Sequence, residues 1–247
     1  MCSKGPKLGI LCAGDDELIP FLSLLDPYRI TEKAMLKFYE GNFNGVQAVA
    51  LYSGVCKVNA AVATQILIDS FHCTAVINSG TAGGMDPALE LFDTVVAAES
   101  AYWDVAEDIL TEFHPWLPAP VFPADTGLLA LARKVAQEMP QGAPRDSGRV
   151  VFGTVATGEA FIDDSNRPQV QARLHPLSVD METAAAAHVC YVNRIPFLSV
   201  RTITDTPSHS GQAAFEENCA KASQIAAKFV FRLAGKLAGK LPVQSRR

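Results

Sequence analysis

The sequence lacks an excess of positive charge and any dense basic run. Its 247 residues include 21 Lys and Arg against 26 Asp and Glu, which gives a formal net charge of −5. Proteins that bind nucleic acid neutralise phosphates with clustered cations. The only clustered cations here, Lys236, Lys240, Arg246 and Arg247, are thinly spread over a C-terminal tail. We therefore expect no nucleic-acid partner.

Long apolar runs and paired metal-ligand motifs are also missing. No stretch reaches the roughly 20 apolar residues that span a bilayer, and residues 1–6 lack the apolar region of a signal peptide. The 6 cysteines include no Cys-x-x-Cys pair, and the 5 histidines show no metal-ligand spacing. We therefore expect a cytoplasmic protein with reduced cysteines, no membrane segment, no metal site and no cofactor.

The composition is that of an ordinary globular protein, with 49% apolar and 19% charged residues. Apolar runs predict strands over residues 7–13, 34–43, 46–53, 75–78, 92–98, 150–156, 177–179 and 196–203. Helical spacing predicts one helix that begins between residues 15 and 20, and four more over residues 57–71, 125–137, 181–192 and 213–237. Asn44-Gly45 predicts a hairpin turn. This alternation predicts an α/β fold, a single domain over residues 1–247, built as a three-layer sandwich around a mixed, mainly parallel sheet.

Two segments between these elements have unusual compositions. Residues 80–84, Gly-Thr-Ala-Gly-Gly, follow the strand over 75–78 and are predicted to form a loop of small residues that lets a flat base or a ribose approach the backbone. Residues 106–123 are rich in proline and contain Phe113, Trp116 and Phe122. We expect this second segment to be a loop.

Polar side chains follow several predicted strand ends, where ligands bind in parallel α/β sheets. Each has a structural alternative, since Asp180 could cap the following helix and Asp205 could be a turn residue before Pro207. Several carboxylates with few cations suit chemistry that builds positive charge, such as glycosidic cleavage through an oxocarbenium-like transition state. The candidate set is Glu17, Thr81, Asp180, Glu182, Thr204 and Asp205.

A dinucleotide-binding site is the natural competing interpretation for an α/β protein. The first strand is followed by Gly14-Asp15-Asp16-Glu17, without the G-x-G-x-x-G pattern. Three acids at a helix start would repel a pyrophosphate. Residues 80–84 lack the lysine of a phosphate-binding loop. The sequence therefore argues against nucleotide phosphates at either position.

Several short motifs follow one another along the chain: Leu8-Gly9-Ile10 with Glu17, residues 53–61 (SGVCKVNAA), 78–84 (NSGTAGG), 157–162 (TGEAFI), 179–184 (VDMETA) and 201–205 (RTITD). In order and spacing, this set resembles the nucleoside phosphorylase and nucleosidase superfamily over residues 7–237. It looks most like the bacterial 5′-methylthioadenosine/S-adenosylhomocysteine nucleosidases. The resemblance implies hydrolysis of the N-glycosidic bond of 5′-substituted adenosines with release of adenine, no cofactor, and a homodimer.

The resemblance also assigns roles to individual residues. Glu17 matches the acid that activates the attacking water, and Asp205 matches the acid that protonates adenine on its imidazole ring. Glu182 matches the carboxylate that holds the ribose hydroxyls, and Met181 the thioether that packs on the ribose. The other matched positions are Phe161 and Ile162 at the base, Thr81, Ala82 and Gly83 beneath sugar and base, and Val55, Asp180, Arg201, Thr204 and Phe215 as further substrate contacts.

The sequence departs from the family pattern at several positions. Asp180 replaces a usual glutamate, and Thr81 and Thr204 replace serines. Between residues 102 and 118, the family's Tyr-His-Asp and Phe-Gly-Tyr segments, which a partner subunit contributes to the 5′-substituent pocket, are replaced by Tyr-Trp-Asp and Phe-His-Pro-Trp. We predict that residues 102–122 lie near the partner's site and form a lid that alters the preference among 5′-substituents.

Three other functions compete with this hydrolysis: phosphorolysis, cleavage of aminodeoxyfutalosine, and nucleoside binding without catalysis. A phosphorylase binds an anion beside the anomeric carbon, usually with arginines and a Gly-rich turn, whereas Asp15, Asp16 and Glu17 occupy the first turn here. An aminodeoxyfutalosine nucleosidase would share the adenosine core of the substrate. A non-enzymatic nucleoside-binding relative would be expected to lose the catalytic acids, which this chain retains. We therefore favour a hydrolase.

Overall fold

The computed structural model of the protein describes residues 6–113, 117–139, 148–162, 165–208 and 212–238. They form a 10-stranded sheet and the helices around it. The strands are β1 (Lys7–Cys12), β2 (Tyr28–Lys33), β3 (Leu36–Phe43), β4 (Val46–Tyr52), β5 (Ala75–Gly84), β6 (Thr94–Tyr102), β7 (Phe122–Pro123), β8 (Val150–Thr157), β9 (Ser178–Asp180) and β10 (Phe197–Asp205). The helices are α1 (Asp15–Leu24), α2 (Lys57–Asp69), α3 (Glu107–Glu112), α4 (Thr126–Glu138), α5 (Arg167–Leu174), α6 (Thr183–Asn193) and α7 (Gln212–Leu237).

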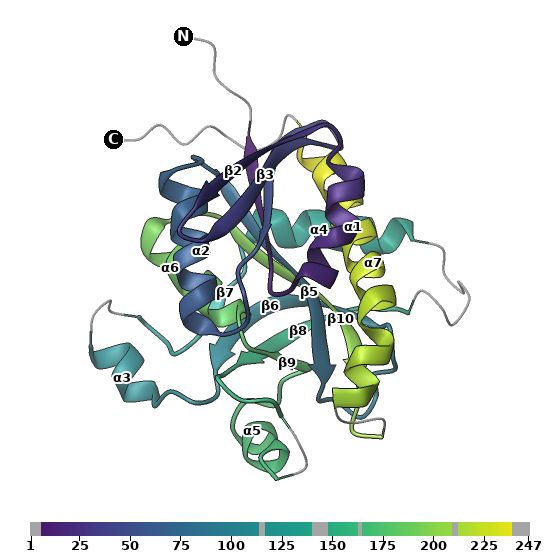
Figure 1. Ribbon diagram of the computed structural model, residues 1–247. Helices are drawn as coiled ribbons and strands as arrows, with labels where there is room; N and C mark the ends of the chain where they lie inside the picture. Colours follow the sequence, from purple (N-terminus) through teal and green to yellow (C-terminus); the bar gives the residue numbers. More distant parts are fainter. Residues whose placement is uncertain (1–5, 114–116, 140–147, 163–164, 209–211, 239–247) are drawn as a thin grey trace.

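The sheet lies between two layers of helices, as the sequence predicts (Figure 1). Helices α1, α4 and α7 cover one face, and α2 and α6 cover the other. Neighbouring side chains of a strand point to opposite faces. Ile77 of β5 therefore packs in the core beneath α1, α4 and α7, while Val76 packs in the core beneath α2 and α6. No helix within the described ranges is long and apolar enough to cross a membrane.

Strand pairing brings distant parts of the chain together around β5 and β10. β10 pairs in parallel with β5 and antiparallel with β6. β6 pairs with β8, β8 with β9, and β9 with β5, so these strands close into a ring. The mixed sheet is confirmed, and its antiparallel pairs extend beyond the predicted hairpin to β10–β6, β5–β9 and β6–β7.

The predicted glycine-rich loop at residues 80–84 is wrong, because these residues continue β5 to Gly84. The strand stays paired with β10, with Thr81 opposite Thr202 and Gly83 opposite Asp205. A Cβ atom at Gly80 would overlap the carboxyl group of Glu17. Small residues are therefore needed here so that a neighbouring side chain can approach the strand, and not to form a loop.

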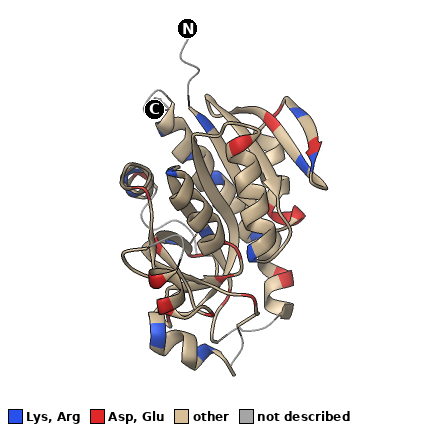
Figure 2. Cartoon of the chain, turned by 90° about the vertical axis from the view of Figure 1, so that its left-hand side faces the viewer, with Lys and Arg blue, Asp and Glu red and all other residues tan. Residues whose placement is uncertain are grey.

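Several elements were not predicted. β2 pairs with β3 through a turn in which Ala34 and Met35 both have positive φ, of 51° and 63°, without the glycine or asparagine that usually marks such a turn. Helix α1 begins at Asp15, within the predicted window, and contains Pro20 in its interior. α3, α5 and β7 were also missed. Figure 2 shows that the β2–β3 hairpin carries charges of both signs.

The segment predicted to be a loop over residues 106–123 is more ordered than expected. It contains α3 and β7, and the Phe122 ring packs against Tyr102, His188 and Tyr191. Phe113 is 58% exposed, and Trp116 lies outside the described residues. Phe122 is therefore a core residue, and of the named aromatics Phe113 remains available for a lid.

Candidate active site

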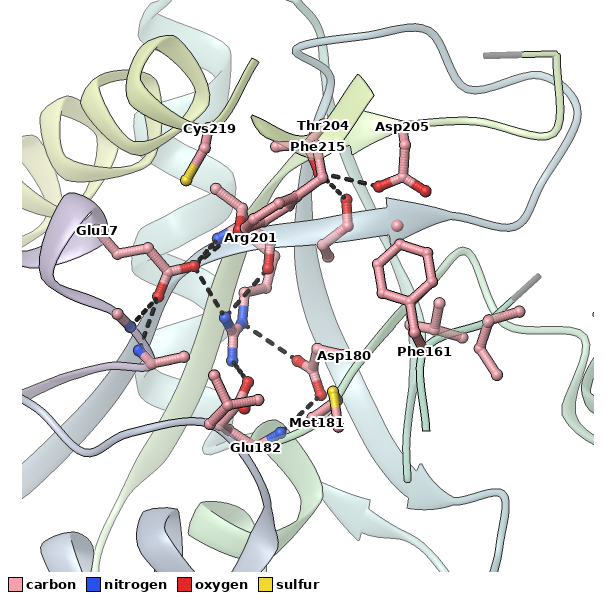
Figure 3. Close-up of a pocket in the computed structure, with 18 of the residues that line it drawn as sticks. Glu17, Phe161, Asp180, Met181, Glu182, Arg201, Thr204, Asp205, Phe215 and Cys219 are labelled. Carbon is pink, nitrogen blue, oxygen red and sulfur yellow. Dashed lines mark hydrogen bonds and ion pairs between the residues drawn. The ribbon is translucent and has the colours of Figure 1, made fainter. Parts of the chain in front are cut away.

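The predicted site residues surround one pocket of about 550 Å³ (Figure 3). It is lined from α1, β5, the loop after β8, the start of α6, the end of β10, and α7. Every residue predicted for the site lines it: Glu17, Val55, Thr81, Ala82, Gly83, Phe161, Ile162, Asp180, Met181, Glu182, Arg201, Thr204, Asp205 and Phe215.

The sequence analysis missed further lining residues. On α7, Gln212 and Cys219 lie three residues before and four after Phe215, so the three share a helix face. That periodicity is the signal that could have found them. Burial raises the pKa of the Cys219 thiol to about 11, which keeps it protonated and unreactive at neutral pH. The remaining missed residues are Ala13, Gly14, Asp15, Asp16, Ala160 and Val179.

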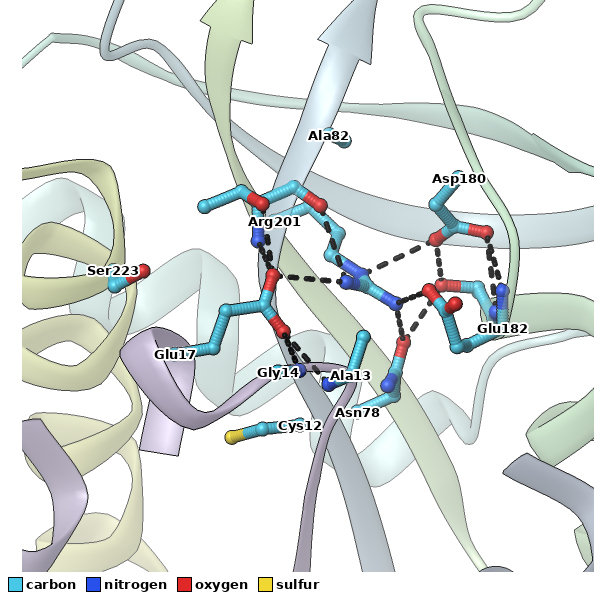
Figure 4. Close-up of polar contacts among 12 residues, drawn as sticks. Cys12, Ala13, Gly14, Glu17, Asn78, Ala82, Asp180, Glu182, Arg201 and Ser223 are labelled. Carbon is cyan, nitrogen blue, oxygen red and sulfur yellow. Dashed lines mark hydrogen bonds and ion pairs between the residues drawn. The ribbon is translucent and has the colours of Figure 1, made fainter. Parts of the chain in front are cut away.

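Glu17 lies in the first turn of α1 with its carboxylate turned toward β5 (Figure 4). Its Oε2 accepts hydrogen bonds from the backbone N–H of Ala13 at 2.7 Å and of Gly14 at 3.3 Å. Its Oε1 accepts bonds from the N–H and the hydroxyl of Thr81 at 2.7 and 2.8 Å. These donors fix the carboxylate in one orientation at the pocket wall, as a general base requires.

Arg201 on β10 forms the centre of a buried ionic network and is 1% exposed. Its guanidinium lies 3.6 Å from Glu17 Oε1, 3.2 Å from Asp180 Oδ2 and 3.1 Å from Glu182 Oε2. It also donates to the Thr81 carbonyl at 3.1 Å and to Asn78 Oδ1 at 2.7 Å. Burial lowers its pKa, but the surrounding carboxylates raise it further, so the net shift is upward. Most of the hydrogen-bonding capacity of the guanidinium is thus used to hold other site residues in place.

Asp180 organises the start of α6. It accepts hydrogen bonds from the Thr157 hydroxyl at 2.6 Å and from the N–H groups of Glu182 and Thr183 at 3.3 and 3.1 Å, and it also bonds the Thr183 hydroxyl. The structural alternative, in which this residue caps the helix, is corrected in one respect: the N-cap of α6 is Glu182, and Asp180, two residues earlier, accepts the N–H groups of the cap and of the first helical residue. Its role as a substrate contact stays a prediction.

Glu182 faces the pocket beside Met181 (Figure 3). Its Oε1 accepts the N–H of Cys56 at 2.9 Å, and its Oε2 accepts a bond from Arg201 at 3.1 Å. Burial raises the pKa of Glu182 to about 7, Asp180 and Glu17 add to the rise, and Arg201 opposes it. The cost of burying the charge therefore brings the pKa of this carboxyl group toward neutral pH.

Asp205 is the last residue of β10, so the turn-residue alternative is wrong. Its Oδ1 accepts the Thr204 hydroxyl at 3.0 Å, and Oδ2 has no hydrogen-bond donor among the described residues. Burial raises the pKa of Asp205, while the Thr204 hydroxyl and the charge of Arg167 lower it, with a net rise. A buried carboxyl group with one free oxygen suits a proton donor.

The loop after β8 supplies Phe161, which is 48% exposed, and Ile162, which is buried. Asp104 ties this loop to α2, since it bonds the Lys57 ammonium at 2.9 Å and accepts the N–H of Glu159 at 2.9 Å. Glu159 in turn accepts the Lys57 N–H at 3.0 Å. This ring of contacts fixes the loop after β8 relative to Val55 and Cys56.

The arrangement places a fixed carboxylate, Glu17, and a buried acid, Asp205, on opposite sides of one pocket (Figure 3). Glu182 and Met181 lie along the wall between them, and the exposed Phe161 ring stands near Asp205. Within the described ranges, no group of three or more His, Cys, Asp or Glu side chains is placed to hold a metal ion. The site can therefore supply a base and an acid to a small ligand held between them.

Comparison with known proteins gives the family. Residues 7–234 match the model of the phosphorylase superfamily. A 5′-methylthioadenosine/S-adenosylhomocysteine nucleosidase of Psychromonas ingrahamii is 34% identical over 85% of this chain and 90% of that protein. The crystal structure of such a nucleosidase from Colwellia psychrerythraea in complex with adenine aligns with a TM-score of 0.86 at 32% identity, covering 96% of this chain and 98% of that one. Futalosine hydrolase of Helicobacter pylori aligns with a TM-score of 0.82 at 26% identity, covering 94% and 98%. The chain therefore belongs to the phosphorylase superfamily and, within it, to the family of 5′-methylthioadenosine/S-adenosylhomocysteine nucleosidases.

Proposed function

We propose that the protein hydrolyses the N-glycosidic bond of 5′-substituted adenosines, of the methylthioadenosine and S-adenosylhomocysteine type, and releases adenine. Family membership supports this activity. The observation that carries it is the opposed pair of Glu17 and Asp205 across one pocket. Hydrolysis needs both a base to activate water and an acid to protonate the leaving base.

In this mechanism Asp205 protonates the adenine imidazole ring as the bond between the anomeric carbon and the base breaks. The bonding electrons leave with adenine, and positive charge develops on the ribose ring. Glu17 takes a proton from the water that attacks the anomeric carbon. Glu182 accepts hydrogen bonds from the ribose hydroxyls, Met181 packs on the ribose, and Phe161 stacks on the base.

The surroundings of Glu17 favour water over phosphate as the attacking group. Among the described lining residues, Arg201 alone is cationic, and its guanidinium contacts the carboxylates of Glu17, Asp180 and Glu182. Asp15 and Asp16 also line the pocket beside Glu17. A phosphate ion would therefore meet carboxylates where it needs free cationic donors.

Adenine release in phosphate-free buffer tests the reaction class. We expect turnover without phosphate or added metal, a free sugar as the second product, and no stimulation when phosphate is added. Formation of a ribose 1-phosphate, or a requirement for phosphate, would contradict the proposal. A panel of methylthioadenosine, S-adenosylhomocysteine, 5′-deoxyadenosine and aminodeoxyfutalosine would then rank the 5′-substituents.

We infer that two copies associate through the flank that carries α2, α3 and α6 (Figure 1). Large apolar side chains are exposed there, and an exposed apolar patch of this kind marks an association surface. A two-fold interface uses the same patch on both copies. Because residues 102–122 contribute Ile109 and Phe113 to this patch, they would lie against the partner and near its site. The exposed residues are Val58 (72%), Val62 (45%), Ile109 (50%), Phe113 (58%), Tyr191 (40%) and Val192 (47%).

Light scattering measures this association directly. We expect the mass of a dimer, and a shift toward the monomer for Val58→Glu, because a charge would be buried at the interface. Ile30→Glu, on the remote β2 strand and 50% exposed, is the matched control and should leave the mass unchanged. A monomeric native protein would contradict the inference.

A further inference from the structure

Arg167 is a cationic residue next to the leaving-group side of the pocket that the proposed mechanism does not use. It is the first residue of α5. Its Nη1 donates to the Gly84 carbonyl at 3.0 Å and lies 3.2 Å from Met85 Sδ. Its Nε is buried and has no hydrogen-bond partner within the described ranges. The guanidinium is thus held at the end of β5 by contacts that leave part of its hydrogen-bonding capacity unused.

The end of β5 lies directly against Asp205. Gly83 is the register partner of Asp205 in the β5–β10 pairing. A Cβ atom at Gly83 would lie 3.2 Å from Asp205 Oδ2, and one at Gly84 would lie 3.1 Å from the Asp205 carbonyl oxygen. With glycine at both positions, no side chain of β5 separates Arg167 from this part of the pocket.

Apart from Arg201, which shares β10 with Asp205, the other charges that line the pocket come from different elements. On α7, the lining side chains Gln212, Phe215 and Cys219 are uncharged, and β5 contributes Thr81, Ala82 and Gly83. The charged lining residues besides Asp205 are Asp15, Asp16 and Glu17 of α1, Asp180 at the end of β9, Glu182 at the N-cap of α6, and Arg201 of β10. Figure 3 shows Glu17, Asp180, Glu182 and Arg201 on the side of the pocket away from Asp205.

We propose that Arg167 is a positioning residue for Asp205, which anchors the end of β5 behind the acid and places a positive charge beside it. This inference rests on the proposed role of Asp205 as the general acid. Burial alone makes a carboxyl group a weak acid that parts with its proton reluctantly. A nearby cation lowers the pKa of Asp205 and so offsets part of the rise that burial causes, and the pKa of a proton donor sets the pH range in which it can act.

The pH dependence of turnover tests the inference. Asp205 must be protonated to act, so turnover falls as pH rises through its pKa. Arg167→Met removes the positive charge, so the pKa of Asp205 rises and the alkaline limb of kcat should move to higher pH, by up to about one unit. Arg167→Lys keeps the charge and should leave the limb near its native position.

Arg173 provides the matched control on the same helix. It donates to the carbonyls of Trp103 and Val105 at 2.9 and 2.6 Å and lies 3.7 Å from Glu107, and within the described part of the chain it makes no hydrogen bond to β5. Arg173→Met should therefore leave the alkaline limb where it is. A purely structural role for α5 would instead make Arg167→Met and Arg173→Met behave alike.

The outcomes separate this inference from the general-acid assignment. If Arg167→Met leaves the limb unmoved while Asp205→Asn is inactive, the inference fails and the general acid stands. If Asp205→Asn remains active, the general-acid assignment itself fails. Should Arg167→Met not fold, Arg167→Gln gives the same readout. If neither folds while Arg167→Lys does, Arg167 has a structural role and the inference is overturned.

Discussion

The two ends of the pocket hold their carboxyl groups in opposite ways. Around Glu17, Asp180 and Glu182, backbone N–H groups, hydroxyls and the shared Arg201 occupy the carboxylate oxygens. At the other end, Asp205 accepts one hydroxyl, and no described residue donates to its other carboxylate oxygen. The first end is held by these donors around one shared cation, and the second is buried with one carboxylate oxygen that accepts no hydrogen bond among the described residues. The difference suits a base and ribose holder at one end and a proton donor at the other.

The largest expected effect comes from removing the proton donor. Asp205→Asn keeps the shape and a hydrogen bond but has no proton to give, so kcat should fall about 10²–10⁴-fold. Binding of an adenine-containing inhibitor should fall far less. Single-turnover kinetics and inhibitor titration measure the two quantities. Retention of more than about a tenth of native turnover is well above what loss of a general acid permits and would exclude this role.

Glu17→Gln should also abolish turnover, for a different reason. The variant cannot take a proton from water, whereas the leaving group can still be protonated by Asp205. A substrate whose leaving group needs no protonation should therefore rescue Asp205→Asn and leave Glu17→Gln inactive. Rescue of both variants, or of neither, would show that the two ends of the pocket do not divide the chemistry in this way.

Removing the shared cation should affect stability as well as activity. Arg201→Met leaves three buried carboxylates without their counter-charge, and breaking a buried ion pair costs about 3–5 kcal/mol in the free energy of unfolding. Arg29→Met is the surface control, since Arg29 pairs with Glu40 while 76% exposed, and should cost less than about 1 kcal/mol. Urea unfolding measures both. Equal losses would mean that the buried network contributes no more than a surface pair.

A smaller effect should appear in the pH dependence of ligand binding. In the proposed mechanism, ribose hydroxyls donate to the ionised form of Glu182, whose pKa burial raises to about 7. Below that pH the carboxyl group must lose a proton to bind, so the Kd of a hydroxyl-bearing inhibitor should rise by up to about tenfold per pH unit. An analogue without the 2′- and 3′-hydroxyls is the control. The pH range just below the raised pKa of Glu182, about 5 to 7, is the one to measure. A Kd that does not change over this range would contradict the role of Glu182 in holding the ribose hydroxyls.

The smallest effect is expected outside both ends, at the exposed Phe113. Phe113→Ala should change the ranking among 5′-substituted adenosines more than it changes activity on the best substrate. Phe122→Ala serves as the contrast, because Phe122 is 2% exposed and its loss should lower stability. kcat/KM across the substrate panel measures the ranking. Equal losses on every substrate after Phe113→Ala would indicate a structural role and no selective lid.

Local patterns were enough to predict most strands and helices and to find the strand ends that line the pocket. They failed where tertiary contacts decide the conformation. Residues 80–84 read as a loop, but pairing with β10 keeps them extended. The Ala34–Met35 turn has no residue that favours positive φ. The place of Arg201 among three carboxylates depends on strands and helices far apart in sequence, so the sequence pointed only to a substrate contact.

The insertion of β10 between β5 and β6 has a consequence for synthesis of the chain. Residues of β5 and β6 leave the ribosome about a hundred residues before β10, since Ala75–Gly84 and Thr94–Tyr102 precede Phe197–Asp205. Until β10 arrives, the facing edges of β5 and β6 have no strand between them, and unpaired strand edges are prone to aggregate. A nascent chain can therefore form the β1–β5 half of the sheet early. The pocket, with Asp205 at the last strand end, is completed only when the final third of the protein has been made.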